Sequence, residues 1–344
     1  MKELGIGVIG CGFMGKTQVE TVTKFVKGAT VKAVADVNEA AAQEVAAKYG
    51  IGWEKTVEAL VARDDIDGVF IETPHFLHGE QALTAIRAGK HVMIEKPMAH
   101  TVELCDRIIE EGRRNGVLVS TVFSQRSRVC NLKAKELIDK GEIGKVRQLF
   151  EFHLLAGGLV KFPKWQSSRE NLGILFGHAI HCLDRIRWLT GAEYATVYSK
   201  CFSLDPSAVV EGTTMALMTM TDGTTVSLWS SGELPPPPFP RREFSVMIVG
   251  EKGLMDVDAY GDLLINTSGK WEVAEKQPPV DWAGKGFLDP VRLQSFTRHA
   301  QGFIDAIHEH RQPPVTGWDG RQAVAAALAA YESAGSGREI LLNK

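Results

Sequence analysis

Short apolar runs alternate with longer segments of helical periodicity along the first third of the chain. The runs are rich in β-branched residues and predict strands, whereas apolar positions that recur every three to four residues predict helices. The predicted strands are residues 4–9, 30–35, 68–72, 91–94 and 117–122, and predicted helices follow each of the first four. This alternation requires right-handed crossovers and a parallel sheet. The fold class predicted is α/β, with an N-terminal doubly wound Rossmann sheet.

The pattern changes after residue 122. A helix is predicted over residues 130–140, a long strand over 146–155, a helix within 171–191, several strands joined by turns between 194 and 265, and two final helices over 292–309 and 320–334. Turns such as the T-D-G-T sequence at residues 221–224 join neighbouring antiparallel strands. We therefore predict two domains, residues 1–122 with the Rossmann fold and residues 123–344 as an α+β domain with a large, mostly antiparallel sheet.

The first predicted strand runs into Gly10, Gly12 and Gly15, which have the G-x-G-x-x-G spacing of a dinucleotide-binding turn. The first glycine permits a tight turn, the second lets the backbone approach a pyrophosphate, and the third lets the following helix pack on the strand. The free N–H groups at the start of that helix would bind the phosphates. The spacing alone is weak evidence in a chain with 34 glycines, but its strand–turn–helix context supports it.

Asp36 closes the second predicted strand, about 20 residues after Gly15, where an acidic side chain binds the adenosine ribose hydroxyls of a dinucleotide. Its carboxylate would repel a 2′-phosphate, and neither Val37 nor Asn38 is an arginine that would receive one. The predicted cofactor is therefore NAD rather than NADP. Thr73 and Lys96 also lie at the ends of predicted parallel strands, the edge at which such sheets bind ligands.

Composition narrows the function classes. The chain has 344 residues, 44% hydrophobic content and a net charge of −3, which gives no basic surface for nucleic acid. We find no signal peptide and no apolar run of the ~20 residues that a membrane span needs, so we expect a cytoplasmic protein. The five cysteines lack paired C-x-x-C spacing, and we expect packed thiols rather than disulfides or a zinc site.

Several segments together make the chain resemble the Gfo/Idh/MocA family of oxidoreductases. They are G-C-G-F-M-G at residues 10–15, T-P-H-F-L-H at 73–78, A-G-K-H-V-M-I-E-K-P at 88–97 and G-H-A-I-H-C-L-D at 177–184. The resemblance extends over nearly the whole chain. It implies an NAD(P)-binding Rossmann domain followed by a sheet domain, and hydride transfer between nicotinamide and a carbon of a sugar, cyclitol or related polyol.

The resemblance also implies roles for individual residues. Lys96, in the E-K-P sequence, corresponds to the family lysine that helps to transfer the hydroxyl proton, or it merely hydrogen-bonds the substrate. A lysine in a partly dry site can have a pKa low enough for proton transfer. The expected cofactor contacts, besides the glycines and Asp36, are Phe13, Met14, Thr73, Pro74, His75, His78, Glu95 and Lys96. The substrate contacts expected are Lys96, Arg126, His178 and His181, with Trp165 and Arg169 as weaker candidates.

One departure from the family concerns an aspartate and a histidine four residues apart. His181 matches the histidine, but Gly177 stands where the aspartate is expected, and His178 follows it. His178, His181 and Asp184 are spaced by three residues and would lie on neighbouring parts of one helical face. His178 is either catalytic or a packing residue, and Asp184 is expected to make an anchoring hydrogen bond to the other domain. Two histidines one turn apart also raise the possibility of a metal site, but we predict none.

Three functions remain open at this level. The first is an NAD-dependent sugar or polyol dehydrogenase with Lys96 and His181 as its catalytic groups. The second is a redox-neutral enzyme that oxidises its substrate transiently before elimination, glycosidic cleavage or epimerisation and then returns the hydride. The third is a non-catalytic NAD-binding regulator, which the retained Lys96 and His181 disfavour.

Assembly is predicted from the strands of the second domain. In residues 215–220 both alternating sets of side chains are apolar, and residues 226–229 continue the pattern. One face can pack on the helices of its own domain, whereas the other would leave an apolar patch in water. We expect a homodimer or homotetramer joined through these sheets.

Overall fold

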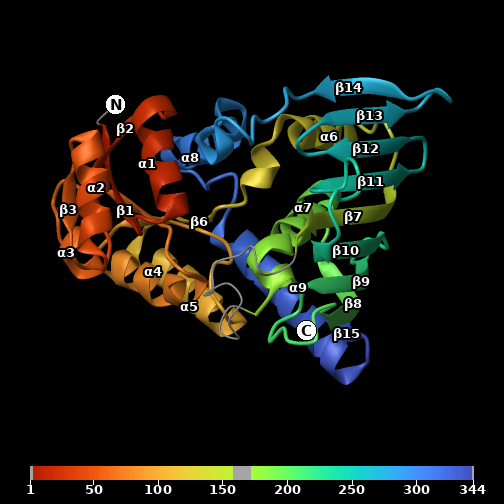
Figure 1. Ribbon diagram of the computed structural model, residues 1–344, viewed down its shortest axis with the longest axis horizontal. Coiled ribbons are helices and arrows are strands. Elements are labelled where there is room, and N and C mark those ends of the chain that lie inside the picture. Colours follow the sequence, from red (N-terminus) through yellow and green to blue (C-terminus); the bar gives the residue numbers. More distant parts are fainter. Residues whose placement is uncertain (1–2, 158–171, 343–344) are drawn as a thin grey trace. The chain divides into compact units, whose positions relative to one another are not determined.

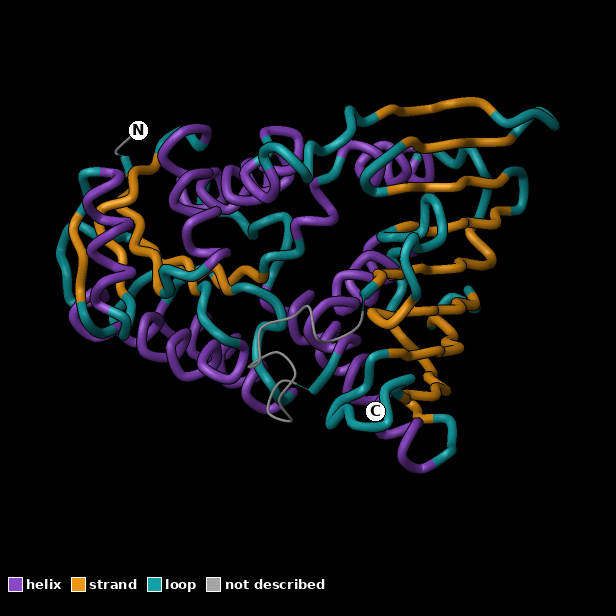
Figure 2. The backbone as a smooth tube through the Cα atoms, viewed as in Figure 1, coloured by secondary structure: helices purple, strands orange, loops and turns teal. Residues whose placement is uncertain are grey.

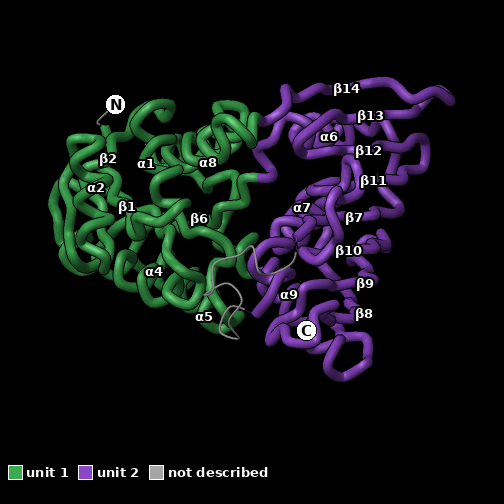
Figure 3. The backbone as a smooth tube through the Cα atoms, viewed as in Figure 1, with its two compact units in different colours: residues 1–124, 281–321 green, residues 125–280, 322–344 purple. Residues whose placement is uncertain are grey.

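The computed structural model describes residues 3–157 and 172–342. The chain forms two compact units, the first made of residues 1–124 and 281–321 and the second of residues 125–280 and 322–344 (Figure 3). Within the described residues, no helix is long and apolar enough to span a membrane.

The first unit contains a six-stranded parallel sheet in the order β3-β2-β1-β4-β5-β6 (Figure 1). Its strands are β1 (Leu4–Ile9), β2 (Ala29–Ala35), β3 (Gly52–Glu54), β4 (Gly68–Ile71), β5 (His91–Ile94) and β6 (Val119–Thr121). The order reverses between β1 and β4, which is the switch point where doubly wound sheets bind ligands. The predicted fold class is confirmed for this unit.

Helices cover both faces of this sheet. They are α1 (Phe13–Phe25), α2 (Glu39–Tyr49), α3 (Val57–Val61), α4 (His78–Arg87), α5 (Val102–Asn115) and α8 (Pro290–His308). On one face, Val19 and Val22 of α1, Val45 of α2 and Phe303 of α8 form a buried core with the strands. On the other face α4 packs against both α3 and α5.

The first unit includes a segment from late in the chain. The sequence places residues 281–321 in a domain of residues 123–344, but in the structure they belong to the compact unit of the N-terminal sheet. The physical reason is the apolar face of α8, on which Phe296, Ala300 and Ile304 are nearly fully buried in the core shared with α1. A local pattern shows that α8 is amphipathic but not which sheet it covers.

The second unit contains a nine-stranded sheet in the order β14-β13-β12-β11-β7-β10-β9-β8-β15 (Figures 1 and 2). The strands are β7 (Val146–Ala156), β8 (Tyr194–Phe202), β9 (Thr213–Met220), β10 (Thr225–Leu234), β11 (Ser245–Gly250), β12 (Leu254–Asp258), β13 (Asp262–Asn266), β14 (Glu272–Lys276) and β15 (Ile340–Leu341). All pairs are antiparallel except β7 with β10. The predicted large, mostly antiparallel sheet is therefore confirmed.

Helices α6 (Val129–Asp139) and α7 (Ile180–Thr190) lie on one face of this sheet (Figure 1). Helix α9 (Gly317–Ser336) begins in the first unit and continues into the second. A buried ion pair ties α7 to β7, because Arg185 donates from Nε to Glu151 Oε1 over 3.0 Å. Both side chains are almost completely buried, and Arg185 Nη1 also donates to Asn131 Oδ1 at 3.3 Å.

The middle of strand β7 directs Leu149 and two polar side chains, Glu151 and His153, to its covered face, and Phe150 and Phe152 to its outer face. Glu151 and His153 are fully buried, whereas Phe150 is 36% exposed. The outer face continues over β9, where Met215 and Leu217 are 51% and 60% exposed while Ala216 is buried. The predicted apolar patch is therefore confirmed.

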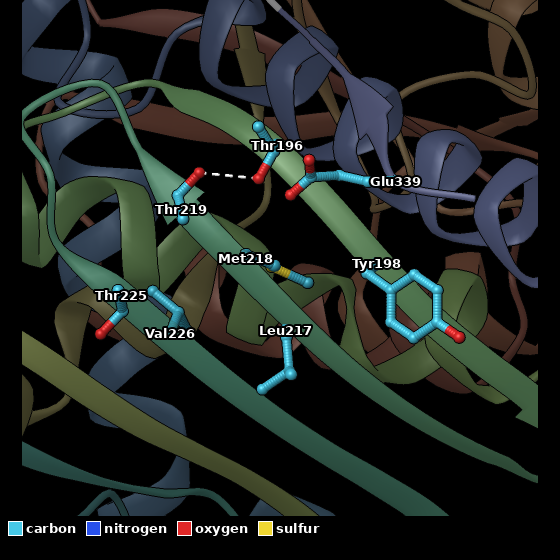
Figure 4. Close-up of a pocket in the computed structure, with 8 residues that line it drawn as sticks. All are labelled: Thr196, Tyr198, Leu217, Met218, Thr219, Thr225, Val226 and Glu339. Carbon is cyan, nitrogen blue, oxygen red and sulfur yellow. Dashed lines mark hydrogen bonds between the residues drawn. The ribbon is translucent and has the colours of Figure 1, made fainter. Parts of the chain in front are cut away.

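A shallow groove of about 400 Å³ crosses this patch (Figure 4). Its floor is formed by β8, β9 and β10, with Leu217 and Tyr198 as the exposed apolar side chains. A hydrogen bond of 2.7 Å joins the hydroxyls of Thr196 and Thr219, two of its lining residues (Figure 4).

The buried ion pair yields a stability prediction. Glu151→Ala leaves Arg185 buried without its carboxylate, so we expect a loss of about 3–5 kcal/mol in the free energy of unfolding of the second unit. The double variant Glu151→Leu/Arg185→Met should lose much less, since both charges are removed together. Urea denaturation followed by circular dichroism measures these losses.

The matched control is Glu193→Ala. This change removes a carboxylate that is paired with Arg187, which lies on α7 as Arg185 does. That pair is partly exposed, and its loss should cost only about 0–1 kcal/mol. Equal losses from Glu151→Ala and Glu193→Ala would show that the buried pair does not anchor α7.

Candidate active site

The glycine-rich turn has the geometry of an anion-binding site. Gly10 has a φ of 99°, and a Cβ atom there would lie 2.7 Å from the Glu72 carbonyl oxygen. A Cβ at Gly15 would lie 1.8 Å from the Gly10 carbonyl oxygen, whereas Gly12 has no atom within 4 Å of that position. Helix α1 begins after Gly12 without a side-chain cap, so its first N–H groups are available to a diphosphate.

Asp36 is fixed by backbone amides at the end of β2. Its Oδ2 accepts from the Cys11 N–H at 2.7 Å and its Oδ1 from the Asn38 N–H at 2.8 Å. The carboxylate is thus held beside the dinucleotide turn and remains partly exposed. This position suits binding of two ribose hydroxyls.

The two residues after Asp36 differ in what they do. The Asn38 side chain accepts from the Ala41 N–H at 3.3 Å and caps α2. The Val37 side chain is 91% exposed. Neither supplies a positive charge for a 2′-phosphate.

Charged side chains gather at the ends of β4 and β5. Glu72 and Glu95 are each 6% exposed, and Lys96 is partly buried beside them. Burial, together with the neighbouring Glu95, raises the pKa of Glu72 well above its usual range. Burial also lowers the pKa of Lys96, against the opposing effect of the two carboxyl groups. A lysine whose pKa is lowered in this way suits proton transfer.

The T-P-H segment, residues 73–75, follows β4 in the chain. Thr73 and Pro74 are partly exposed, and Thr73 Oγ1 donates to Gln81 Oε1 at 2.5 Å. His75 is largely buried, with its ring 5.8 Å from that of His78. Thr73, Pro74 and His75 remain predicted cofactor contacts.

His78 has a structural environment. It is fully buried, and its Nδ1 and Nε2 atoms lie 2.8 Å from the carbonyl oxygens of Pro97 and Thr73. Burial lowers the pKa of His78 to about 4, which keeps the ring neutral at neutral pH. The ring lies between the T-P-H segment and the E-K-P segment, and in its neutral form it donates to one of the two carbonyl oxygens. The cofactor contact of His78 stays a prediction.

Arg292 of α8 reaches the same region of the first unit. Its guanidinium donates to the Phe287 carbonyl oxygen at 2.6 Å and lies 3.9 Å from Met14 Sδ. Burial raises the pKa of Glu95, and the positive charges of Lys96 and Arg292 oppose that rise. The Phe13 and Phe287 rings meet edge to face, 4.2 Å apart, beside this arginine. Phe13 and Met14 therefore lie between the turn and the segment that leads into α8.

The second unit brings three histidines together. His153 of β7 lies stacked against His178, with ring centroids 6.2 Å apart, and its Nδ1 is 3.1 Å from Ser230 Oγ. The His153 ring is also 4.5 Å from that of Phe244, which meets His181 edge to face at 6.2 Å. His178 and His181 are both partly exposed.

His178 lies in a π-helical turn, Leu175–Ala179, that precedes α7. The sequence predicts one continuous helical face, but the wider turn changes the spacing, and His178 packs on His153 while His181 packs on Phe244. Glu211 holds this turn by accepting from the Leu175 N–H at 2.8 Å and from the Tyr331 hydroxyl at 2.9 Å. Burial raises the pKa of Glu211 to about 8. π-Turns of this kind are frequent at functional sites.

Arg126 and Asp184 form a bidentate ion pair. Arg126 donates from Nε to Asp184 Oδ2 at 2.8 Å and from Nη2 to Oδ1 at 2.5 Å, and both side chains are buried. Asp184 therefore anchors α7 to Arg126, a residue of its own unit. The pair uses two of the five N–H donors of the guanidinium, and the substrate contact of Arg126 stays a prediction.

Trp165 and Arg169 lie outside the described residues. Among residues 3–157 and 172–342, no group of three or more His, Cys, Asp or Glu side chains is placed to hold a metal ion.

Comparison with known proteins identifies the family. A family model described as an oxidoreductase family with an NAD-binding Rossmann fold matches residues 4–123, and the model of the GFO/IDH/MocA C-terminal domain matches residues 131–256. The chain belongs to the Gfo/Idh/MocA family. As a member of it, the chain is an NAD-binding oxidoreductase, and the glycine turn and Asp36 fit that cofactor.

Three similar proteins illustrate the range of this family. Inositol 2-dehydrogenase 2 of Saccharopolyspora erythraea is 36% identical over 195 residues, which is 56% of each chain. Inositol 2-dehydrogenase of Salmonella typhimurium is 26% identical over 97% of this chain and 95% of its own. The crystal structure of Lactobacillus casei scyllo-inositol dehydrogenase with NAD(H) and scyllo-inositol has a TM-score of 0.82 at 24% identity, covering 99% of each chain.

The sequence reasoning missed four residues of these two clusters: Glu72, Arg292, His153 and Ser230. Two of them had a local signal. Glu72 ends an otherwise apolar strand, and His153 alternates with Glu151 on the side of β7 opposite its phenylalanines. Arg292 had none, because only the tertiary fold brings α8 to the dinucleotide turn.

Cofactor preference can be tested at the end of β2. We expect the parent protein to bind NAD much more tightly than NADP. The double variant Asp36→Ser/Val37→Arg should reduce the difference between the two affinities, because it removes a repulsive carboxylate and adds a guanidinium. Val37 is the site for the arginine because Asn38→Arg would also remove the α2 cap, at a cost of about 1 kcal/mol. Titration by nicotinamide fluorescence gives both affinities.

Val37→Arg alone is the control, and it should retain most of the NAD preference since Asp36 is still present. Equal affinity of the parent protein for NAD and NADP would contradict the role assigned to Asp36.

Proposed function

We propose that this protein oxidises a hydroxyl group of a cyclitol, sugar or related polyol, with Lys96 as the proton-transfer group. The observation that carries the proposal is the partly buried lysine at the end of β5, set beside two buried carboxyl groups and close in the fold to the dinucleotide turn. The names of the inositol dehydrogenases that align with this chain support the substrate class.

The chemistry assigns one task to each group. Bound NAD supplies the hydride acceptor. Removal of hydride from an alcohol carbon becomes easy when the hydroxyl proton leaves as well, and Lys96 accepts that proton in its neutral form. His181 is proposed as the second polar group toward substrate, and His178 either shares the proton or holds His181 in place by packing.

Incubation with NAD and a panel of inositols, sugars and glycosides tests the reaction. Absorbance of reduced nicotinamide is expected with at least one cyclitol or sugar. Product without net reduction of NAD would favour the redox-neutral alternative, which the absence of a carboxylate at Gly177 keeps open. NAD binding without any product would favour a regulator.

Loss of the lysine should show in the turnover rate. We expect Lys96→Met to lower kcat by about 10²–10⁴ while NAD affinity changes little, because this is the usual size for a lost proton-transfer group. Steady-state kinetics and nicotinamide fluorescence measure the two effects. Lys24→Met, at an exposed lysine of α1, is the control and should retain full activity. Full activity of Lys96→Met would overturn this mechanism.

The two histidines can be separated in the same assay. A fall in kcat from both His178→Asn and His181→Asn, with a flatter pH profile near neutrality, would mean that they share the proton. A fall from His181→Asn alone would make His178 a packing residue.

We also propose that the outer face of the nine-stranded sheet joins two copies of the chain, as a homodimer or within a homotetramer. An exposed apolar surface that includes Met215 and Leu217 favours a partner of the same kind, and an antiparallel sheet can offer the same face to a second copy. The cytoplasmic location of the protein stays a prediction from the sequence.

Analytical ultracentrifugation tests the assembly. The parent protein should sediment at a multiple of its 37.7 kDa mass, and Leu217→Glu should shift it toward the monomer. Leu204→Glu, at a 63% exposed leucine outside the strands of the sheet, is the matched control. A parent protein that sediments as a monomer at micromolar concentration would contradict the proposal.

A further inference from the structure

The π-helical turn that carries His178 is held by two other segments of the second unit. The loop between β8 and β9 supplies Glu211, and α9 supplies Tyr331. Both residues are partly buried. They lie far from the turn in sequence, so the position of the turn depends on the tertiary fold of this unit.

Three successive N–H groups at the start of the turn donate to these two residues. The Leu175 N–H donates to Glu211 Oε1 at 2.8 Å, and the Phe176 N–H donates to the Tyr331 hydroxyl oxygen at 3.2 Å. The Tyr331 hydroxyl donates to Glu211 Oε1 at 2.9 Å, and the Ile174 N–H donates to the Glu211 carbonyl oxygen at 3.2 Å. The start of a helix leaves such N–H groups without partners in the helix itself, and here other segments supply the acceptors.

The carboxyl group of Glu211 lies directly against the main chain that enters the turn. Gly173 has a φ of 121°, and a Cβ atom there would lie 1.6 Å from Glu211 Oε2. A glycine therefore leaves the space that the carboxyl group occupies. Burial raises the pKa of Glu211 to about 8, so the group is mostly the uncharged acid at neutral pH.

The place of the His178 ring depends on this turn. The ring lies stacked on that of His153, with centroids 6.2 Å apart, and His153 Nδ1 is 3.1 Å from Ser230 Oγ. The residue before His178 is Gly177, which has no side chain to anchor the turn and is unfavourable inside a helix. The hydrogen bonds from the loop and from α9 supply the anchor instead.

We propose that Glu211 and Tyr331 are positioning residues that act on the reaction through His178. They accept from consecutive N–H groups, hold the π-helical turn in one place and so keep the His178 ring against His153. The inference rests on the proposed function, in which His178 either shares the substrate proton or packs so as to hold His181. Both roles require a ring of fixed position.

Glu211→Ala and Glu211→Gln test the proposal as a pair. Glu211→Ala removes the acceptor for the Leu175 N–H, and we expect kcat to fall by roughly 10–100-fold with little change in NAD affinity, because a displacement of about 1 Å has an effect of this size. Glu211→Gln keeps an acceptor oxygen and the shape of the uncharged acid, so it should retain most of the activity.

Tyr194→Phe is the matched control. It removes a buried hydroxyl that donates to the Leu183 carbonyl oxygen of α7 at 2.6 Å, away from the π-helical turn. This variant should leave kcat unchanged.

A double-mutant cycle shows whether Glu211 acts through His178. If it does, Glu211→Ala/His178→Asn should have the same kcat as His178→Asn alone, because the ring that Glu211 positions is already absent. A double variant whose loss is the product of the two single losses would overturn the proposal.

Nuclear magnetic resonance of the NAD-bound protein with carbon-13-labelled histidine rings reports on His178 without catalysis. The signal of His178 is the one that is lost in His178→Asn. Glu211→Ala should shift this signal, because the ring leaves its stack on His153, whereas Glu211→Gln and Tyr194→Phe should not. Tyr331→Phe removes the second acceptor and should shift the signal in the same direction, and it replaces Glu211→Ala if that variant does not fold.

The outcomes separate the two proposals. An unchanged His178 signal in Glu211→Ala and Tyr331→Phe would overturn the positioning role. A shifted signal with unchanged kcat would leave the support of the turn standing and overturn the part of His178 in the reaction.

Discussion

Charge held out of water at the ends of β4 and β5 is the constraint on which much of the first unit depends. An isolated buried ion costs several kcal/mol even after relaxation. Burial raises the pKa of both Glu72 and Glu95, the neighbouring Glu95 raises that of Glu72 further, and the positive charge of Lys96 opposes both effects. The parallel register of β4 and β5 brings the two glutamates together, and Arg292 from α8 adds a second positive charge that favours the charged form of Glu95. The glycines of the dinucleotide turn leave the space in which Glu72 lies.

The second unit also buries polar side chains, on its central strand β7. Its central strand β7 points Glu151 and His153 into the covered face, where Arg185 and Ser230 provide partners. On the outer face, Phe150 of the same strand is partly exposed. The alternation therefore directs polar groups into the interior and apolar groups to the surface.

Much of the fold follows from local patterns in the sequence. The strand–helix alternation, the glycine spacing and the acid after β2 are short-range signals, and the structure contains the five strands that they predict. The sixth strand of the sheet, β3, was not predicted, because its three residues are too short for a local pattern. The pairing of Arg126 with Asp184 and the π-turn under His178 were not predictable, since both depend on contacts between segments far apart in sequence. The roles of the predicted site residues stay predictions, and at the histidine cluster Gly177 departs from the expected pattern.

The late position of α8 bears on how the chain folds as it is synthesised. Phe296, Phe303 and Ile304 complete the core against α1, yet they emerge from the ribosome long after residue 124. At ordinary rates of translation this interval is roughly 10–40 s. During that time the apolar side of α1 and its strands has no permanent cover, so the nascent N-terminal segment resembles a folding intermediate with exposed core and is a natural substrate for chaperones.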